Sequence, residues 1–437
     1  MTDKETPASS NSDETARAQT TTEALEWHAP VMVRIDEHTT IPHLLKERVQ
    51  RGATRPLILR KVGIGDTWRS ISARDFYDEV QSVAAGLMAR GLEPGDRVAI
   101  MSRTRYEWTL LDFACWAAAL VPVPIYETSS IDQVAHVLVD ADVNLIVTET
   151  VSMAEIVRAA AERENRDNTH VLSLDSEAID TLIAEGATVP RDRVAARADK
   201  LTTDDIATIV YTSGTSGTTG TPKGTVLSHE NFTNLCVNAH VWMPEIAAHK
   251  NSRLLLFLPL AHVFARFLQV FQISGNGVLG HAPNIKNLLP DLASFKPSYL
   301  LVVPRVLEKI YNSADTKARG PKQKIFRWAA KVAIAYSQAL DTEEGPSVSL
   351  EAQHMLADRL VYQQIIRLVG GNADYIVSGG APLAPWLAHF YRGVGIPVLE
   401  GYGLTETVGP VSVNTPRLSK IGTVGPALPP MSFKISD

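Results

Sequence analysis

The chain has 437 residues, of which 45% are hydrophobic and 21% charged, with a formal net charge of −6 at pH 7. This length and composition can supply at least two hydrophobic cores, and the negative balance gives no electrostatic footprint for nucleic acid. The two cysteines, Cys115 and Cys236, both lie in apolar sequence, which indicates reduced cytoplasmic thiols rather than a disulfide framework or a metal site.

The chain begins with a polar tail, residues 1–23, that is rich in Thr, Ser and Glu and has no apolar core of its own. We expect this tail to be disordered, and it lacks the pattern of a signal peptide. The most apolar stretches, residues 108–125 and 254–271, are interrupted by charged residues and proline. Both fall short of the roughly 20 uninterrupted apolar residues that a membrane span needs, so we interpret them as buried helices and strands.

Helical and strand patterns alternate through the first half of the chain. Apolar residues at helical spacing, Phe76, Val80, Val83 and Leu87, predict a helix that ends at Gly91. The segments that follow are predicted as strand, helix, strand, helix, strand, helix and strand at residues 97–101, 106–119, 121–125, 131–140, 143–148, 152–162 and 171–174. Such alternation predicts a parallel sheet with helices on both faces.

A polar, charged stretch near residues 185–205 separates this half from a second one of the same kind. We therefore expect two α/β subdomains, residues 24–200 and residues 201–437. The strands predicted in the second are residues 206–211, 254–258, 299–303, 375–378 and 398–399. Ligands bind where parallel strands end, so the loops after these strands are the candidate site.

The first of these loops, residues 211–224, reads YTSGTSGTTGTPKG and leads towards a helix that Ser228 could cap. Backbone N–H groups, hydroxyls and the Lys223 ammonium would let a polyphosphate approach closely. A flexible linker of the same composition is the alternative. The loop is not an ordinary P-loop, because Lys223 lies between Pro222 and Gly224 rather than before Ser or Thr.

Four further motifs follow predicted strands and would leave the same edge of a doubly wound sheet: LPLAHVFAR at 258–266, VPRVLEK at 303–309, SGGAPL at 378–383 and GYGLTET at 401–407. Glycines on either side of Tyr402 would leave its ring open to a flat base. Thr405 offers a hydroxyl donor, and Glu406 is a hard oxygen ligand suited to Mg²⁺ beside phosphates. For single motifs the alternatives are a tight turn at GYG, a helix-starting turn at Ala381-Pro382 and a satisfied core histidine at His262.

Together these motifs resemble those of the adenylate-forming superfamily, in particular the long-chain fatty acyl-CoA synthetases. The resemblance covers about residues 67–437 and includes Pro259 and His262 of a PxxH motif and the long-chain-like segment VPVPIYETSS at 121–130. It implies an α/β fold, the large N-terminal body of such an enzyme, with two doubly wound parallel-sheet subdomains and a smaller β-rich portion. The family's mobile C-terminal domain, which carries a lysine that assists adenylation, is absent, so impaired turnover is expected.

The resemblance also implies roles for individual residues. Thr212, His262, Thr405 and Glu406 would be catalytic, with Thr212 and Glu406 holding Mg²⁺ and His262 near the acyl carboxylate. The residues implied to bind ATP are Thr212, Ser213, Gly214, Thr215, Ser216, Gly217, Thr218, Thr219, Gly220, Lys223, Gly380, Ala381, Pro382, Gly401, Tyr402, Gly403 and Thr405.

The implied reaction joins a long-chain fatty acid to MgATP, giving acyl-AMP and pyrophosphate, and then transfers the acyl group to coenzyme A with release of AMP. An acyl-AMP ligase that delivers to a carrier protein, and a nucleotide- and acyl-binding module without turnover, are the alternatives. The sequence predicts neither the acyl chain length nor the oligomeric state, for which a homodimer is one option.

The chain departs from the family pattern at two places within the matching motifs. Its phosphate loop carries three extra residues, a repeated Ser-Gly-Thr, and Arg266 stands where some relatives have an aromatic gate four residues after the histidine. Arg266 could attract a fatty carboxylate or a coenzyme A phosphate, or form a structural ion pair.

A basic cluster spans residues 317–331, beside apolar Ile325, Trp328 and Val332. Peripheral contact with an anionic membrane, at its inner face, is one interpretation. A solvated helix face on a cytoplasmic protein is the interpretation that we favour.

Overall fold

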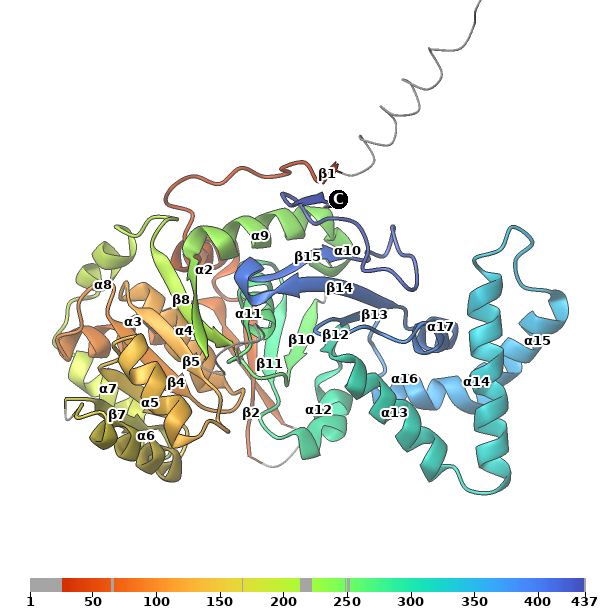
Figure 1. The fold of residues 1–437 in the computed structure, drawn as a ribbon, viewed down its shortest axis with the longest axis horizontal. Helices are drawn as coiled ribbons and strands as arrows, with labels where there is room; N and C mark the ends of the chain where they lie inside the picture. Colours follow the sequence, from red (N-terminus) through yellow and green to blue (C-terminus); the bar gives the residue numbers. More distant parts are fainter. Residues whose placement is uncertain are drawn as a thin grey trace, which may run out of the picture.

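In the computed structural model of this chain, a four-stranded sheet and an eight-stranded sheet lie side by side, with helices packed around them (Figure 1). The predicted pair of parallel-sheet α/β subdomains is confirmed. None of the described helices is long and apolar enough to cross a bilayer. The structure describes residues 26–63, 67–166, 168–212, 222–247, 249 and 252–435, so the predicted tail at 1–23 lies outside it.

The four-stranded sheet has the order β5-β4-β6-β7, and all its neighbouring strands are parallel. Its strands are β4 (Arg97–Met101), β5 (Val121–Ile125), β6 (Leu145–Thr148) and β7 (His170–Ser173). Its helices are α3 (Ala73–Ala89), α4 (Tyr106–Ala117), α5 (Ile131–Asp140), α6 (Val151–Arg163), α7 (Ala178–Gly186) and α8 (Arg191–Ala198), with the short η1 (Leu174–Ser176). The alternation predicted for this half is confirmed by the element order β4, α4, β5, α5, β6, α6 and β7. Strands β4, β5 and β6 are almost entirely buried, as expected for parallel strands covered by helices.

The eight-stranded sheet has the order β15-β14-β13-β12-β10-β11-β2-β3, parallel from β14 to β2 with an antiparallel strand at each edge. Its strands are β2 (Pro56–Lys61), β3 (Trp68–Ser72), β10 (Arg253–Leu256), β11 (Val278–His281), β12 (Tyr299–Val302), β13 (Tyr375–Ser378), β14 (Val398–Leu404) and β15 (Gly409–Val413). Strand pairing therefore crosses the predicted boundary at residue 200, because β2 and β3 precede the first sheet in the chain but belong to the second. At the chain ends, β1 (Glu26–His28) pairs with β16 (Ser432–Lys434).

A separate antiparallel hairpin joins the two bodies. Its strands are β8 (Ile206–Thr212) and β9 (Lys223–Ser228). The strand predicted at 206–211 exists, but the expectation that it belongs to the second parallel sheet was wrong. It lies instead beside β5, where the Thr208 hydroxyl donates to the Pro122 carbonyl at 2.6 Å. The predicted cap is confirmed, since Ser228 forms a capping box with Asn231 at the start of α9 (His229–Trp242).

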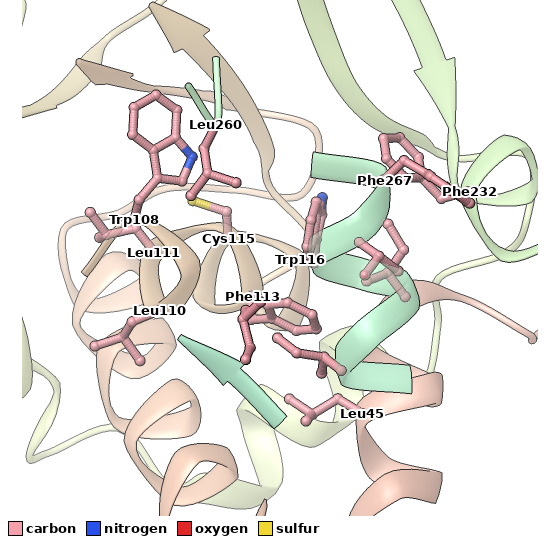
Figure 2. Close-up of a cluster of buried hydrophobic side chains, with 14 of the residues drawn as sticks. Leu45, Trp108, Leu110, Leu111, Phe113, Cys115, Trp116, Phe232, Leu260 and Phe267 are labelled. Atoms are coloured by element: carbon pink, nitrogen blue, oxygen red, sulfur yellow. The ribbon is translucent and has the colours of Figure 1, made fainter. Parts of the chain in front are cut away.

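Helix α4 forms the core between the two bodies. Every residue of α4 is buried, including the charged Glu107 and Asp112 that interrupt its apolar sequence. Figure 2 shows Phe113 and Trp116 of α4 against α11 (Val263–Ser274), with Phe267 of α11 beside Phe232 of α9, and Leu45 of α2 (Ile41–Gly52) below Phe113. The hydrophobic core is thus continuous between the sheets, so the relative placement of their edges is set by packing.

The remaining helices cover the second sheet and form an arm at the right of Figure 1. They are α10 (Pro244–Ala247), η2 (Ile285–Asn287), α12 (Leu288–Phe295), α13 (Pro304–Lys317), α14 (Pro321–Ala339), α15 (Val348–Ala357), the π-helical η3 (Asp358–Tyr362), α16 (Gln363–Leu368) and α17 (Pro385–Val394). Helix α14 buries Phe326, Ala329 and Ala333, and Arg327 pairs with Asp315 at 2.9 Å. This arrangement fits the interpretation of residues 317–331 as a solvated face on a helix whose apolar side is packed.

Three buried histidines predict that the fold loses stability in acid. Burial lowers the pKa of His229, His240 and His281 to about 4 each, whereas an unfolded histidine has a pKa of about 6.5. Protonation of these histidines therefore favours the unfolded chain. The free energy of unfolding is highest above pH 6.5 and falls as the pH is lowered towards 4. When the free energy of unfolding is measured with urea at several pH values between 7.5 and 4.5, its steepest change with pH should approach three protons, or about 4 kcal/mol per pH unit.

A matched pair of variants checks the origin of this slope. Replacing His281 with glutamine is expected to remove about one proton from it, whereas replacing the exposed His170 should leave it unchanged. The same slope in both variants would contradict the assignment to buried imidazoles.

Candidate functional site

A cavity of about 540 Å³ lies where the strand ends of the eight-stranded sheet meet the β8–β9 hairpin. Its size is that of an ordinary small-molecule site. It is lined by Tyr126, Val210, Tyr211, Thr212, His262, Val263, Phe264, Gly379, Gly380, Gly401, Tyr402, Gly403, Leu404, Thr405, Glu406, Gly409 and Pro410. Residues from both halves of the chain therefore share one cavity.

Three of the four predicted strand-end motifs meet there. Strands β10, β12, β13 and β14 are parallel neighbours, so the loops after them leave the same edge of the sheet, as predicted. Segments 258–266, 378–383 and 401–407 contribute cavity residues, whereas 303–309 runs into α13 and contributes none to the lining.

The glycines around Tyr402 also have a structural role that the sequence did not predict. Strand β14 continues through Gly401 and Gly403 and pairs with β15, with a register shift after Tyr402. A Cβ atom on Gly403 would lie 1.8 Å from the Gly409 carbonyl oxygen, and one on Gly401 would lie 3.0 Å from that of Ser412. The glycines allow the close approach of β15, and Tyr402 between them is 46% exposed and lines the cavity.

The loop after β13 forms the next wall. Gly380 has a φ of +81°, a left-handed conformation that favours glycine. Gly380 lines the cavity, and Ala381 and Pro382 follow it as exposed residues. The loop is held by Glu400, which the sequence did not single out: its Oε1 accepts a hydrogen bond of 2.9 Å from the Leu383 N–H.

His262 lies in the cavity wall as the N-cap residue of α11. Its Nδ1 accepts a hydrogen bond of 3.2 Å from the Phe264 N–H, so the proton of the neutral imidazole is on Nε2. Partial burial lowers its pKa, which keeps the ring neutral at pH 7. It is not the core histidine of the alternative interpretation, because it is only partly buried and lies at the positive end of a helix, where anions bind.

Thr212 and Glu406 are both in the cavity lining. A hydroxyl and a carboxylate are hard oxygen donors, and Mg²⁺ commonly takes one or two such groups together with substrate phosphates, so this donor set fits that ion. Among the described residues, no group of three or more His, Cys, Asp or Glu side chains could hold a metal ion. A metal here would therefore depend on oxygens from a ligand.

The hairpin brings two predicted ATP residues opposite each other. Thr212 at the end of β8 pairs with Lys223 at the start of β9. The predicted phosphate-loop residues Ser213, Gly214, Thr215, Ser216, Gly217, Thr218, Thr219 and Gly220 lie outside the described residues.

A match to a known protein family covers both sheets and the cavity. Residues 45–437 match the family described as AMP-binding enzyme. The chain belongs to the AMP-binding enzyme family.

The relatives of this AMP-binding enzyme are named as fatty acid ligases. The chain is 40% identical to the long-chain-fatty-acid–CoA ligase FadD15 of Mycobacterium bovis and 39% identical to that of Mycobacterium tuberculosis, over 94% of this chain and 68% of each relative. It is 30% identical to long chain acyl-CoA synthetase 3 of Arabidopsis thaliana, over 82% of this chain and 56% of that protein.

Solved structures support the fold of this AMP-binding enzyme. The N-terminal domain of FACL13 from Mycobacterium tuberculosis matches with a TM-score of 0.65 and 20% identity, over 89% of this chain and 83% of that one. The Mycobacterium tuberculosis fatty acyl CoA synthetase matches with a TM-score of 0.66 and 20% identity, over 90% and 66% of the two chains. At this identity the likeness is one of fold alone.

Arg266 of this AMP-binding enzyme is a structural residue. Its side chain is fully buried, and its Nη2 and Nε donate to the two carboxylate oxygens of Asp112 at 2.7 and 3.2 Å. Its Nη1 donates to the Thr208 hydroxyl at 2.5 Å. Of the roles considered for Arg266, the structure supports the structural ion pair. It does not support attraction of a fatty carboxylate or a coenzyme A phosphate, since Arg266 is not among the residues that line the cavity.

Proposed function

We propose that this chain is the nucleotide- and acyl-binding body of a long-chain fatty acid–CoA ligase. In the proposed reaction a fatty acid and MgATP give acyl-AMP and pyrophosphate, and coenzyme A then displaces AMP. The observation that carries the proposal is the single cavity shared by Thr212, His262, Tyr402 and Glu406, in a chain that is 40% identical to a long-chain-fatty-acid–CoA ligase.

The nucleotide would lie with its base against the exposed ring of Tyr402 and beside Gly380, Ala381 and Pro382. Its phosphates would face Thr212 and Lys223 at the end of the hairpin. Thr212 and Glu406 would hold Mg²⁺, which when bound neutralises phosphate charge. Thr405, which lines the cavity between Tyr402 and Glu406, is suited to donate to the α-phosphate.

The fatty carboxylate would lie at the N-terminus of α11. The helix end favours an anion there, and the Nε2–H of neutral His262 can donate to it. A carboxylate oxygen attacks the α-phosphorus while the bond to the β-phosphate oxygen breaks, and pyrophosphate leaves. The coenzyme A sulfur, losing its proton, then attacks the acyl carbonyl carbon and AMP leaves. No protein nucleophile takes part, so the protein contributes orientation and charge stabilisation.

An apolar pocket adjoins the cavity and suits the acyl chain. It measures about 30 Å³ and is lined by residues such as Ile246, Leu268 and Val377, while Phe264 and Pro410 line both spaces. About 30 Å³ holds only two or three water-sized groups. A long chain would therefore require Phe264 to move, and each methylene that it buries would contribute about 0.8 kcal/mol.

Replacing Phe264 with a larger residue is expected to lower the activity with long acyl chains more than the activity with short ones. Phe264→Trp should lower kcat/KM for palmitate about tenfold or more, because the larger ring overfills the boundary between the two spaces. Phe264→Ala should instead retain palmitate activity. Acetate, which does not extend into the pocket, is the internal control. Equal changes for acetate and palmitate, measured as AMP release, would contradict this acyl path.

The proposed function is tested on the full-length protein with palmitate, MgATP and coenzyme A. Release of AMP and pyrophosphate with formation of palmitoyl-CoA is expected. Absence of both AMP and pyrophosphate would overturn the proposal. Acyl transfer to a carrier protein but not to coenzyme A would show that the chain belongs to an acyl-AMP ligase instead.

A further inference from the structure

Helix α5 of the first body holds both strands of the hairpin that borders the cavity. His136 and Asp140 are one helical turn apart, so they point to the same side of α5. Asp140 contacts Tyr211 of β8, and His136 contacts both the Tyr211 ring and the backbone of Pro222, just before β9. On the side facing its own subdomain, α5 buries Val134, Ala135, Val137 and Leu138.

The contact to β8 is made by Tyr211, the residue before Thr212. Its hydroxyl donates to Asp140 Oδ2 at 2.6 Å, and its ring lies edge-on to the His136 ring with centroids 5.8 Å apart. Burial and the Asp140 carboxylate raise the pKa of Tyr211, so the hydroxyl keeps its proton. Tyr211 and Ile209 also pack against the apolar cluster of the first body.

The contact to β9 is made by the backbone just before Lys223. His136 Nε2 lies 2.7 Å from the Pro222 carbonyl oxygen. A carbonyl only accepts, so Nε2 carries the proton and donates. Between the two contacts, Tyr211 pairs with Gly224, where a Cβ atom would lie 3.1 Å from Tyr211 Cζ. The absence of a side chain at Gly224 lets the tyrosine ring lie across the hairpin.

We propose that His136 and Asp140 are positioning residues for the phosphates of ATP, acting through the two ends of the hairpin. Asp140 holds Tyr211 and thereby Thr212 in the cavity wall, and His136 holds Pro222 and thereby Lys223 opposite Thr212. The proposal rests on the proposed function, and it makes a helix of the first subdomain part of the nucleotide site. Neither residue touches the substrate itself.

The test uses the full-length protein, with MgATP affinity measured by calorimetry and KM measured for MgATP and palmitate separately. His136→Ala is expected to raise the Kd and KM for MgATP about tenfold, with the KM for palmitate and the thermal midpoint nearly unchanged. His136→Gln places an amide nitrogen near the position of Nε2 and should restore MgATP affinity. His136→Asn, whose amide is too short to reach Pro222, should not.

The hydrogen bond between Tyr211 and Asp140 gives a second arm, because removing the hydroxyl leaves the ring contact between Tyr211 and His136 in place. Tyr211→Phe removes the hydroxyl that donates to Asp140 and is expected to weaken the binding of MgATP several-fold. Asp132→Asn is the matched control, because Asp132 is on the same helix but pairs with Arg163 of α6. Unchanged MgATP affinity in both His136→Ala and Tyr211→Phe would overturn the inference, as would equal losses for both substrates together with a lowered thermal midpoint. A wild-type protein that does not bind MgATP would overturn the proposed function itself.

Discussion

Replacing Asp112 with alanine is expected to lower the free energy of unfolding by about 3–5 kcal/mol, because it leaves a buried guanidinium without its counter-charge. Arg266 and Asp112 are both buried, on helices α11 and α4 that belong to different sheets. Gln269 Nε2 also donates to Asp112 Oδ2 at 3.0 Å. Chemical denaturation monitored by tryptophan fluorescence measures the loss.

Two controls distinguish the effect of breaking the buried ion pair from the effect of removing a charge elsewhere. Asp112→Leu combined with Arg266→Met removes both charges, and it should recover much of the loss because no unpaired charge remains. Asp142→Ala removes a carboxylate that pairs with Arg97 and Arg166 at the surface, and it should cost at most about 1 kcal/mol. A loss below about 1 kcal/mol in Asp112→Ala would show that the pair does not hold the two bodies together.

Replacing Glu406 with glutamine is expected to lower kcat/KM for acyl-AMP formation about 10²–10³-fold in the full-length protein. The substitution keeps the size of the side chain but removes the negative charge that would hold Mg²⁺ against the phosphates. Glu406 is exposed at the cavity, so stability should change little. Pyrophosphate release with palmitate measures the rate, and a Mg²⁺ titration should show a raised half-saturating concentration.

The matched control for this change is Glu344→Gln. Glu344 is exposed in the turn between α14 and α15, on the arm rather than at the cavity. Its replacement should leave both the rate and the Mg²⁺ dependence as in the unaltered protein. A Glu406→Gln enzyme within about fivefold of wild type would contradict the metal role, since loss of a charged transition-state contact costs far more.

Some of the site could be predicted because its signals are local. Thr212, His262, Gly380, Tyr402, Thr405 and Glu406 come from short motifs, and all line the cavity. The roles of several neighbours could not be predicted. Gly403 accommodates the close backbone of Gly409, and Phe264 borders an apolar pocket. Each of these roles depends on a partner that only the fold brings near.

The sequence by itself determined the order of helices and strands from β4 to β7, the cap at Ser228 and the common edge at which the motif loops end. These follow from hydrophobic periodicity and from the rule that parallel strands share their carboxyl edge. Only the tertiary structure decided that β8 and β9 form a separate hairpin, that β2 and β3 join the second sheet, and that Arg266 is buried against Asp112. The physical reason is that pairing between distant strands and compensation of buried charge depend on contacts between segments far apart in the chain, for which local patterns carry no signal.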